Sequence, residues 1–232
     1  MASNEISKKA LITGGTGGIG LAIAKKLDEN NFKVAVTDIY KPKKTPALFF
    51  RCDIRNRRQI NHLYTWVMEN IGVPDILILN AGVGIKEKLY EGDPEKWQKV
   101  MDVNLMGALR CIRAFVPQMM ERQSGNVVFI SSVSSNQPHI YGGIYSASKT
   151  ALDVVAETLR METLPHLHIT TISPGATDTN FFKNQIAGAS DYSKEYAVMD
   201  PEEIAEDVLY TINKKGTRGI NKIITRPLAQ QF

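Results

Sequence analysis

The stretch Thr13-Gly14-Gly15-Thr16-Gly17-Gly18-Ile19-Gly20 decides the fold of this chain, because it joins a strand-length apolar run at Lys9–Thr13 to a helical pattern over 19–29. A glycine-rich turn in that position lets the backbone approach a pyrophosphate at the N-terminus of the helix. The glycines at 14, 18 and 20 have the spacing GxxxGxG, where many dinucleotide sites have GxGxxG. A turn that merely starts a helix is the alternative, but the acid that ends the next strand favours nucleotide binding.

Apolar runs of strand length alternate with helical patterns along the rest of the chain. Ile76-Leu77-Ile78-Leu79 is apolar at every position, which is typical of a parallel sheet covered on both faces. The alternation predicts an α/β fold with a single doubly wound parallel sheet and helices on both faces. The other predicted strands are Lys33–Asp38, 47–52, 75–79, 126–131, 168–173 and Lys222–Thr225, and the other predicted helices are 55–70, 94–122, 145–164 and 201–213. The segment 39–46 has two prolines and no apolar period, so an extended loop is expected there in place of a crossover helix.

The composition limits the classes of function. With 232 residues, 43% hydrophobic and 22% charged, the chain matches one soluble globular domain. The net charge of +4 is mild, and Arg55, Arg57 and Arg58 are expected to form a solvated helix start, not a nucleic-acid surface. Cys52 and Cys111 lack metal-ligand spacing, so two reduced, mostly buried thiols are expected. Without a signal peptide or an apolar run of ~18–20 residues, the protein is predicted to be cytoplasmic and to have no membrane partner.

Asp38, at the end of the second predicted strand, bears on the choice of cofactor. A carboxylate there can accept hydrogen bonds from the adenosine ribose hydroxyls and would repel a 2′-phosphate. This reasoning predicts NAD over NADP. Lys41, Lys43 and Lys44 lie just downstream and are the counter-argument, because a lysine-rich loop could neutralise the phosphate.

Tyr145 and Lys149 are the candidate catalytic pair. At positions i and i+4 of a helix they share one face, so a phenol and an ammonium can serve one site. A neighbouring cation favours the phenolate and would bring the phenol within reach of acid/base work. Alone, the pair reads equally well as a core aromatic and a solvated lysine. Asn104 and Ser132, with Ser131 as the competing hydroxyl, give it weight.

Together these segments resemble the short-chain dehydrogenase/reductase family over essentially the whole chain. TGGTGGIG is similar to the family's TGxxxGxG nucleotide turn, and Asn80-Ala81-Gly82 to its NAG motif. Cys52-Asp53-Ile54 resembles the position where an aspartate meets the adenine ring. Asn104, Ser132, Tyr145 and Lys149 match the catalytic tetrad in order and spacing, and Pro174-Gly175-Ala176-Thr177-Asp178-Thr179 resembles the PGxxxT segment beside the nicotinamide.

The resemblance implies hydride transfer between a nicotinamide and a carbinol or carbonyl carbon. Tyr145 would be the general acid or base, and Lys149 would lower its pKa and hold the nicotinamide ribose. Ser132 would hydrogen-bond the substrate oxygen. Asn104 would hold a water or backbone contact that relays the proton to solvent.

The resemblance also implies a Rossmann fold over residues 1–232 and a homodimer or homotetramer packed through the helices around Asn104 and Tyr145. A short substrate lid is expected near 180–199, where Phe181, Phe182, Tyr192 and Tyr196 lie. No metal is expected. The expected cofactor contacts are Gly14, Thr16, Gly18, Ile19, Gly20, Asp38, Asp53, Ile54, Asn80, Ala81, Gly82, Tyr145, Lys149, Pro174, Gly175, Thr177 and Thr179.

Two functions compete with an NAD(H)-linked oxidoreductase of secondary alcohols or carbonyls. One is an NADPH-dependent reductase of 3-oxoacyl or 3-hydroxy acid substrates, since 220–227 is similar to a branch acting on 3-hydroxy acids. The other is a binding module that senses NAD(H) and regulates a partner. The presence of all four tetrad residues favours catalysis over sensing.

Overall fold

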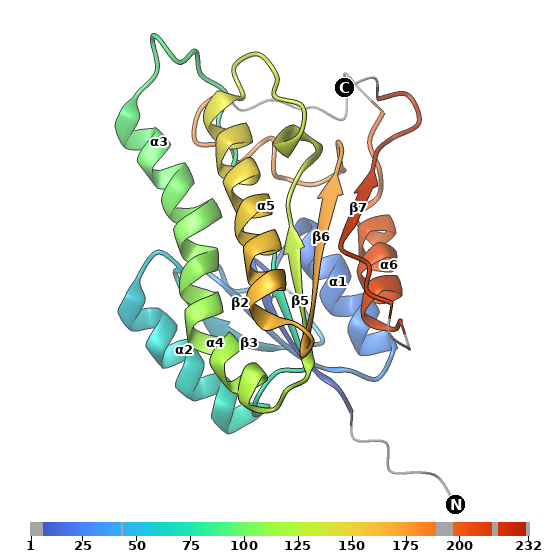
Figure 1. Ribbon diagram of the computed structural model, residues 1–232. Coiled ribbons are helices and arrows are strands. Elements are labelled where there is room, and N and C mark those ends of the chain that lie inside the picture. Colours follow the sequence, from blue (N-terminus) through green and yellow to red (C-terminus); the bar gives the residue numbers. More distant parts are fainter. Residues whose placement is uncertain (1–6, 43, 189–196, 215–217, 231–232) are drawn as a thin grey trace, which may run out of the picture.

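Seven parallel strands form one sheet in the order β3-β2-β1-β4-β5-β6-β7 (Figure 1). The computed structural model describes residues 7–42, 44–188, 197–214 and 218–230. The doubly wound parallel sheet predicted from the sequence is confirmed. Its strands are β1 (Lys9–Thr13), β2 (Lys33–Asp38), β3 (Leu48–Arg51), β4 (Ile76–Leu79), β5 (Gly125–Ile130), β6 (Leu167–Pro174) and β7 (Lys222–Thr225).

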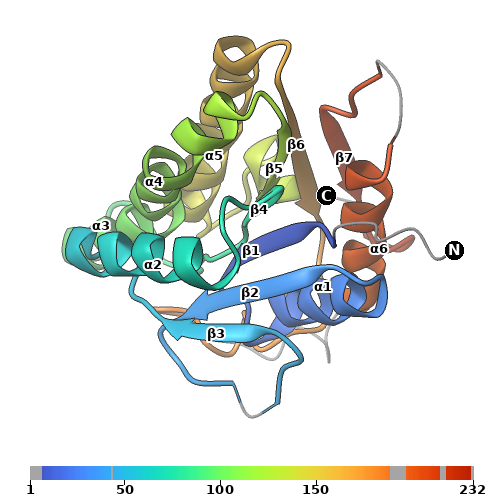
Figure 2. The ribbon, with the colours of Figure 1, turned by 90° about the horizontal axis from the view of Figure 1, so that it is seen from below.

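Helices cover both faces of the sheet (Figure 2). α1 (Gly18–Glu29) and α6 (Pro201–Ile212) lie on one face, and α2 (Arg57–Asn70), α4 (Ala108–Glu121) and α5 (Gly143–Thr163) lie on the other. Side chains of a strand point alternately to the two faces. In β4, Ile76 and Ile78 therefore pack with α1 and α6, whereas Leu77 and Leu79 pack with α2, α4 and α5. Both sets are buried, which explains why this strand is apolar throughout.

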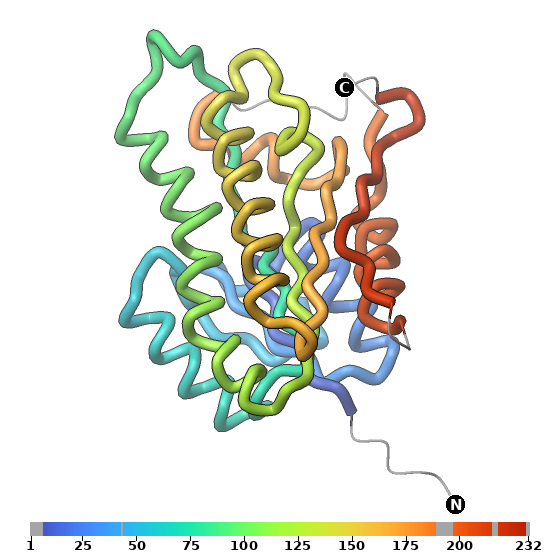
Figure 3. Tube along the Cα trace, viewed as in Figure 1, coloured from blue at the N-terminus to red at the C-terminus, as the bar shows by residue number. Residues whose placement is uncertain are grey.

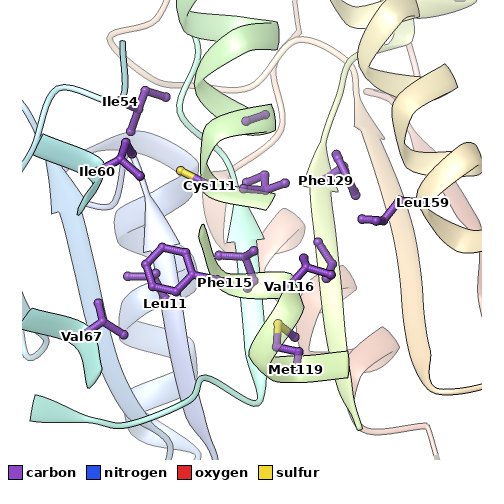
Figure 4. Packing of buried hydrophobic residues seen from close by; sticks show 14 of the residues in the cluster. Leu11, Ile54, Ile60, Val67, Cys111, Phe115, Val116, Met119, Phe129 and Leu159 are labelled. Atoms are coloured by element: carbon purple, nitrogen blue, oxygen red, sulfur yellow. The ribbon is translucent and has the colours of Figure 1, made fainter. Parts of the chain in front are cut away.

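The core beneath α4 shows how this helix is held (Figure 4). Cys111, Phe115 and Met119 recur on one face of α4 and are fully buried against side chains of β1, α2 and β5. Burying each large apolar side chain contributes on the order of 1.5–3 kcal/mol, so the position of α4 is strongly determined. Cys111 and Cys52 are free, buried thiols, as predicted, and burial raises both of their pKa values to about 12.

The segment predicted as one helix over 94–122 is interrupted. α3 (Pro94–Met101) leads into a π-helical segment, η1 (Asp102–Gly107), before α4 begins, so the prediction of a continuous α-helix was wrong. The wider turn brings the buried Asn104 side chain against the Val83 peptide unit, to which it makes two hydrogen bonds. Those bonds offset the poorer backbone geometry of a π-turn.

The loops that follow β4, β5 and β6 gather at one edge of the sheet, at the top of Figure 3. From β1 the chain adds β2 and β3 on one side, and it then crosses to add β4 to β7 on the other side of β1. The strand order therefore reverses at β1, which makes this end of the sheet a topological switch point. The loop after β2 contains no helix in its described residues, 39–42 and 44–47, as predicted. Within the part of the chain that the structure describes, no helix combines the length and apolar character of a membrane span.

Candidate active site

The glycine turn after β1 leaves the N-terminus of α1 open. Gly17 is the N-cap and supplies no side-chain cap, and no atom lies within 4 Å of the place where its Cβ would be. The first N–H groups of α1 thus have no protein partner from a capping side chain and suit a phosphate group. Gly20 has the opposite surroundings, because a Cβ there would lie 2.1 Å from the Gly14 carbonyl oxygen. Gly20 therefore allows the turn to pack on the helix.

Asn80 holds the same turn from the neighbouring strand. Its Nδ2 donates to the carbonyl oxygens of Thr13 (3.0 Å) and Gly14 (2.9 Å). The Thr13 hydroxyl oxygen accepts in return from the backbone N–H groups of Asn80 (3.0 Å) and Ala81 (3.1 Å). Both amide protons of Asn80 are used within the protein, so this residue shapes the nucleotide turn from behind.

Two carboxylates lie at the end of the site beside β2, where the sequence predicts the adenosine to bind. Asp38 Oδ2 accepts from the Thr16 hydroxyl at 2.7 Å, and its Oδ1 accepts from the Ile39 N–H at 2.7 Å. Asp53 pairs with Arg55, with 2.7 Å between Oδ2 and Nη2. The Arg55 hydrogen bonds hold the pKa of Asp53 below its usual value. Both carboxylates are therefore oriented by their own neighbours.

Ser132, Tyr145 and Lys149 meet at the other end. The Ser132 side chain acts on the Tyr145 phenol, and the Lys149 Nζ lies 5.9 Å from the centroid of the Tyr145 ring. The Lys149 ammonium donates to the Ile130 carbonyl oxygen at 2.8 Å, which places it between β5 and α5. The ring of Phe181 packs on Tyr145 with 5.6 Å between centroids. Ser131, the competing hydroxyl, lies instead 3.5 Å from the Lys149 carbonyl oxygen.

Asn104 supports this group from behind. Its Oδ1 accepts from the Val83 N–H (2.8 Å), and its Nδ2 donates to the Val83 carbonyl (3.0 Å) and to Ser148 Oγ (2.9 Å). The orientation of the amide is thereby determined. Oδ1 and the Lys149 Nζ border a space over Gly82, each 3.4 Å from the place a Cβ of Gly82 would occupy.

Burial has the largest effect on the protonation of Tyr145 and Lys149, the predicted catalytic pair. It raises the pKa of Tyr145 to about 12, and the hydrogen bond with Ser132 opposes that rise. Burial also lowers the pKa of Lys149 to about 8, while the charge of Asp153 raises it. The expectation that Lys149 lowers the Tyr145 pKa is not met in the protein alone, because desolvation of the phenolate is the largest effect and Lys149, with its own lowered pKa, is neutral where the phenol titrates. At neutral pH the phenol keeps its proton.

One cavity of about 890 Å³ joins the two ends of the site. Ser132, Tyr145 and Lys149 line it, and so do all the predicted cofactor contacts except Gly20. Gly20 and Asn104 do not line the cavity and instead support the residues that do. The volume lies within the range of small-molecule and cofactor sites. Among the described residues, no cluster of histidine, cysteine or carboxylate side chains could hold a metal ion.

Sequence reasoning missed one residue of the wall and two residues that lie behind it. Gln230, near the end of the chain, lines the cavity, and its Oε1 accepts from the Ala176 N–H at 3.0 Å. Ser148 and Asp153, on the helix that carries Tyr145, act on Asn104 and Lys149. The only signal in the sequence for Ser148 and Asp153 is that both lie on the predicted helix that carries Tyr145 and Lys149. The predicted lid over 180–199 is described in part, since residues 189–196, with Tyr192 and Tyr196, lie outside the described residues.

The short chain dehydrogenase family model matches residues 8–189, more than half of the chain. The chain belongs to the short-chain dehydrogenase family. An uncharacterized oxidoreductase of Staphylococcus saprophyticus is 30% identical over 234 residues, which cover 95% of this chain and 97% of that protein. One from Staphylococcus aureus strain MW2 is 31% identical over 231 residues, with the same coverage of 95% and 97%. Membership makes the chain an oxidoreductase with a Rossmann-type nucleotide-binding fold.

Solved structures agree with this family fold. The closed form of serine dehydrogenase, complexed with NADP+, has a TM-score of 0.88 and covers 97% of this chain and 96% of its own. Its sequence is 24% identical, so the likeness shows the fold alone. An alcohol dehydrogenase from the archaeon Thermococcus sibiricus, complexed with 5-hydroxy-NADP, has a TM-score of 0.85 at 26% identity and covers 97% and 98%.

Proposed function

We propose that this protein transfers a hydride between NAD(H) and a secondary alcohol or carbonyl substrate. The observation that carries the proposal is the meeting of the Ser132 and Tyr145 hydroxyls in the cavity that also contains the open N-terminus of α1. A dinucleotide bound along this cavity would have its phosphates at α1, and its nicotinamide beside the two hydroxyls. When bound, the nicotinamide supplies or accepts the hydride.

The side chains handle the proton and the substrate oxygen. In carbonyl reduction, Tyr145 donates its phenolic proton to the oxygen as the carbon gains the hydride, and the alcohol forms. Ser132 donates a hydrogen bond to the same oxygen and stabilises the charge that develops there. The raised pKa of Tyr145 keeps the proton in place at neutral pH, which suits this direction. Alcohol oxidation runs the same transfers in reverse and needs the phenolate.

Lys149 and Asn104 serve the return of the proton. Lys149 lies beside the Tyr145 ring, and its head borders the space over Gly82 together with Asn104 Oδ1. A water in that space would pass a proton from solvent through Lys149 to the phenolate. The place that a Cβ of Gly82 would occupy lies 3.4 Å from each of the two groups, so the absence of that side chain leaves room for a water near both of them.

Asp38 supports NAD as the cofactor within this proposal. Its carboxylate lines the cavity at the end of β2, where a 2′-phosphate would meet its negative charge. The described lysines of the next loop, Lys41 and Lys44, are exposed and do not line the cavity. The 5-hydroxy-NADP in the 26% identical alcohol dehydrogenase supports NADP(H) as the alternative cofactor.

Tyr145→Phe tests the reaction, and Asp38→Asn tests the cofactor. Consumption of NADH and NADPH is followed against a panel of ketones, keto acids and sugar carbonyls. Turnover that falls at least about a hundredfold in Tyr145→Phe, with NADH binding retained, supports the proposal. Near-normal turnover in that variant contradicts it. Tighter binding of NADPH than of NADH by the unmodified protein contradicts the NAD assignment, and Asp38→Asn is expected to weaken the preference for NADH.

A further inference from the structure

Asp153 lies one helical turn beyond Lys149 on α5 and connects three separate parts of the chain. Its Oδ2 accepts from the Ser135 hydroxyl at 2.8 Å and from the Lys222 ammonium, on β7, at 2.7 Å. Ser135 belongs to η2 (Val133–Ser135), the single turn that directly follows Ser132. One carboxylate therefore joins the Ser132 turn, the helix of Tyr145 and Lys149, and the C-terminal strand.

The contacts around Asp153 hold the Ser132 turn from several sides. Ser135 Oγ also lies 2.8 Å from the Ser132 carbonyl oxygen. A hydroxyl has one proton, and the carboxylate is the stronger acceptor, so the bond to Asp153 is expected to dominate. Thr150 Oγ1 lies 2.8 Å from the Ser135 carbonyl, and the Lys222 Nζ lies 3.3 Å from Asn136 Oδ1. The backbone on the C-terminal side of Ser132 is thus tied to α5 and β7.

The cluster also sets the charges around Lys149. Tyr145, Lys149 and Asp153 follow one another at four-residue intervals along one face of α5, so the Lys149 side chain lies between the phenol and the carboxylate, and Lys222 approaches Asp153 from β7. Burial lowers the pKa of Lys149, and Asp153 is the charged group that opposes this. Asp153 Oδ1 is itself buried and has no hydrogen-bond partner among the described residues. A half-satisfied buried carboxylate costs stability, which calls for a functional explanation.

We propose that Asp153, balanced by Lys222, is a positioning pair of the active site that anchors the Ser132 turn to α5 and places a negative charge behind the Lys149 ammonium. Neither residue lines the cavity, so both act through Ser135 and Lys149. The catalytic part of this inference rests on the proposed function, whereas the charge relation with Lys149 does not.

The first experiment measures Lys149 directly, without substrate. The side-chain amine is titrated by NMR in protein with isotope-labelled lysine, and Lys149→Met assigns its signal. Asp153→Asn is expected to lower the Lys149 pKa by about one pH unit, and Lys222→Met is expected to raise it, because it exposes the carboxylate charge. Glu157→Gln removes an acid from the exposed side of the same helix and should leave the titration unchanged. Equal or absent shifts in the Asp153 and Lys222 variants overturn the charge relation.

The second experiment separates charge from anchoring in turnover. Asp153→Asn keeps an oxygen that can accept from Ser135, so its pH profile should move with the Lys149 titration and its highest kcat should exceed that of Asp153→Ala. Asp153→Ala removes the anchor as well, and kcat should fall by about tenfold at every pH while the KM for the cofactor is kept. An Ala variant that folds by circular dichroism and keeps full kcat overturns the anchoring role. If the unmodified protein reduces nothing, the proposed function fails, and the NMR shifts still decide the charge relation.

Discussion

Replacing Lys149 by Met should make the protein more stable at neutral pH although it removes a residue to which we assign a part in catalysis. The ammonium is 3% exposed, and its pKa falls from 10.5 to about 8. A lowered lysine pKa means that the charge costs folding free energy below about pH 8, and that this cost disappears as the pH rises towards 10.5. From the two pKa values the cost at pH 7 is about 3 kcal/mol. Loss of the hydrogen bond to Ile130 destabilises the variant by about 1 kcal/mol, so its free energy of unfolding is expected to rise by about 2 kcal/mol in total.

The pH dependence identifies the cause. At pH 9.5 only about 1 kcal/mol of the cost remains, so the advantage of Lys149→Met should shrink by about 2 kcal/mol between pH 7 and pH 9.5. Urea unfolding of both proteins at pH 7, 8.5 and 9.5, without cofactor, gives the difference directly. Lys25→Met removes an exposed lysine of α1 and serves as the matched control. A difference that stays constant with pH, or a variant less stable at pH 7, would refute the reasoning.

Two further predictions concern the packing of the glycine turn and the orientation of the Asn104 amide. Gly20→Ala places a Cβ 2.1 Å from the Gly14 carbonyl oxygen and should lower the free energy of unfolding by at least about 2 kcal/mol. Gly17→Ala places its Cβ in open space and should change that free energy little. Urea unfolding of the two variants makes the comparison. Ser148→Ala removes one of the bonds that orient the Asn104 amide. The kcat of this variant should fall several-fold, while its cofactor affinity, measured by fluorescence titration, stays the same. An unchanged kcat would show that the two bonds to Val83 are sufficient to orient the Asn104 amide.

Local pattern was sufficient to predict most of the fold and much of the site. The β-strands follow from short apolar runs such as Ile76–Leu79, and the turn after β1 follows from glycine spacing, because both depend on neighbouring residues. The π-segment at Asn104 was not predictable, since its cause is the peptide of Val83, 21 positions earlier. A helical period continues through 94–122 without a visible break, so periodicity alone favours a single α-helix.

The electrostatics of the site also required the tertiary structure. From the sequence, Lys149 beside Tyr145 predicts a lowered phenol pKa, but the fold buries both groups, and desolvation has the larger effect. The link between Asp153 and Lys222 joins residues 69 positions apart. No local pattern connects them, because their contact exists only once β7 pairs beside β6.

The π-segment η1 also determines how this region can change by mutation. A π-turn corresponds to one residue more than the α-helix requires, and each residue of an α-helix turns its successors by about 100°. Deleting one residue within 102–107 would let α3 and α4 join as a regular helix with better backbone hydrogen bonds. The deletion would also rotate either Asn104 away from Val83 or α3 out of its packing. Shortening this helix is therefore expected to give a more regular helix that has lost the contacts holding Asn104 or α3 in place.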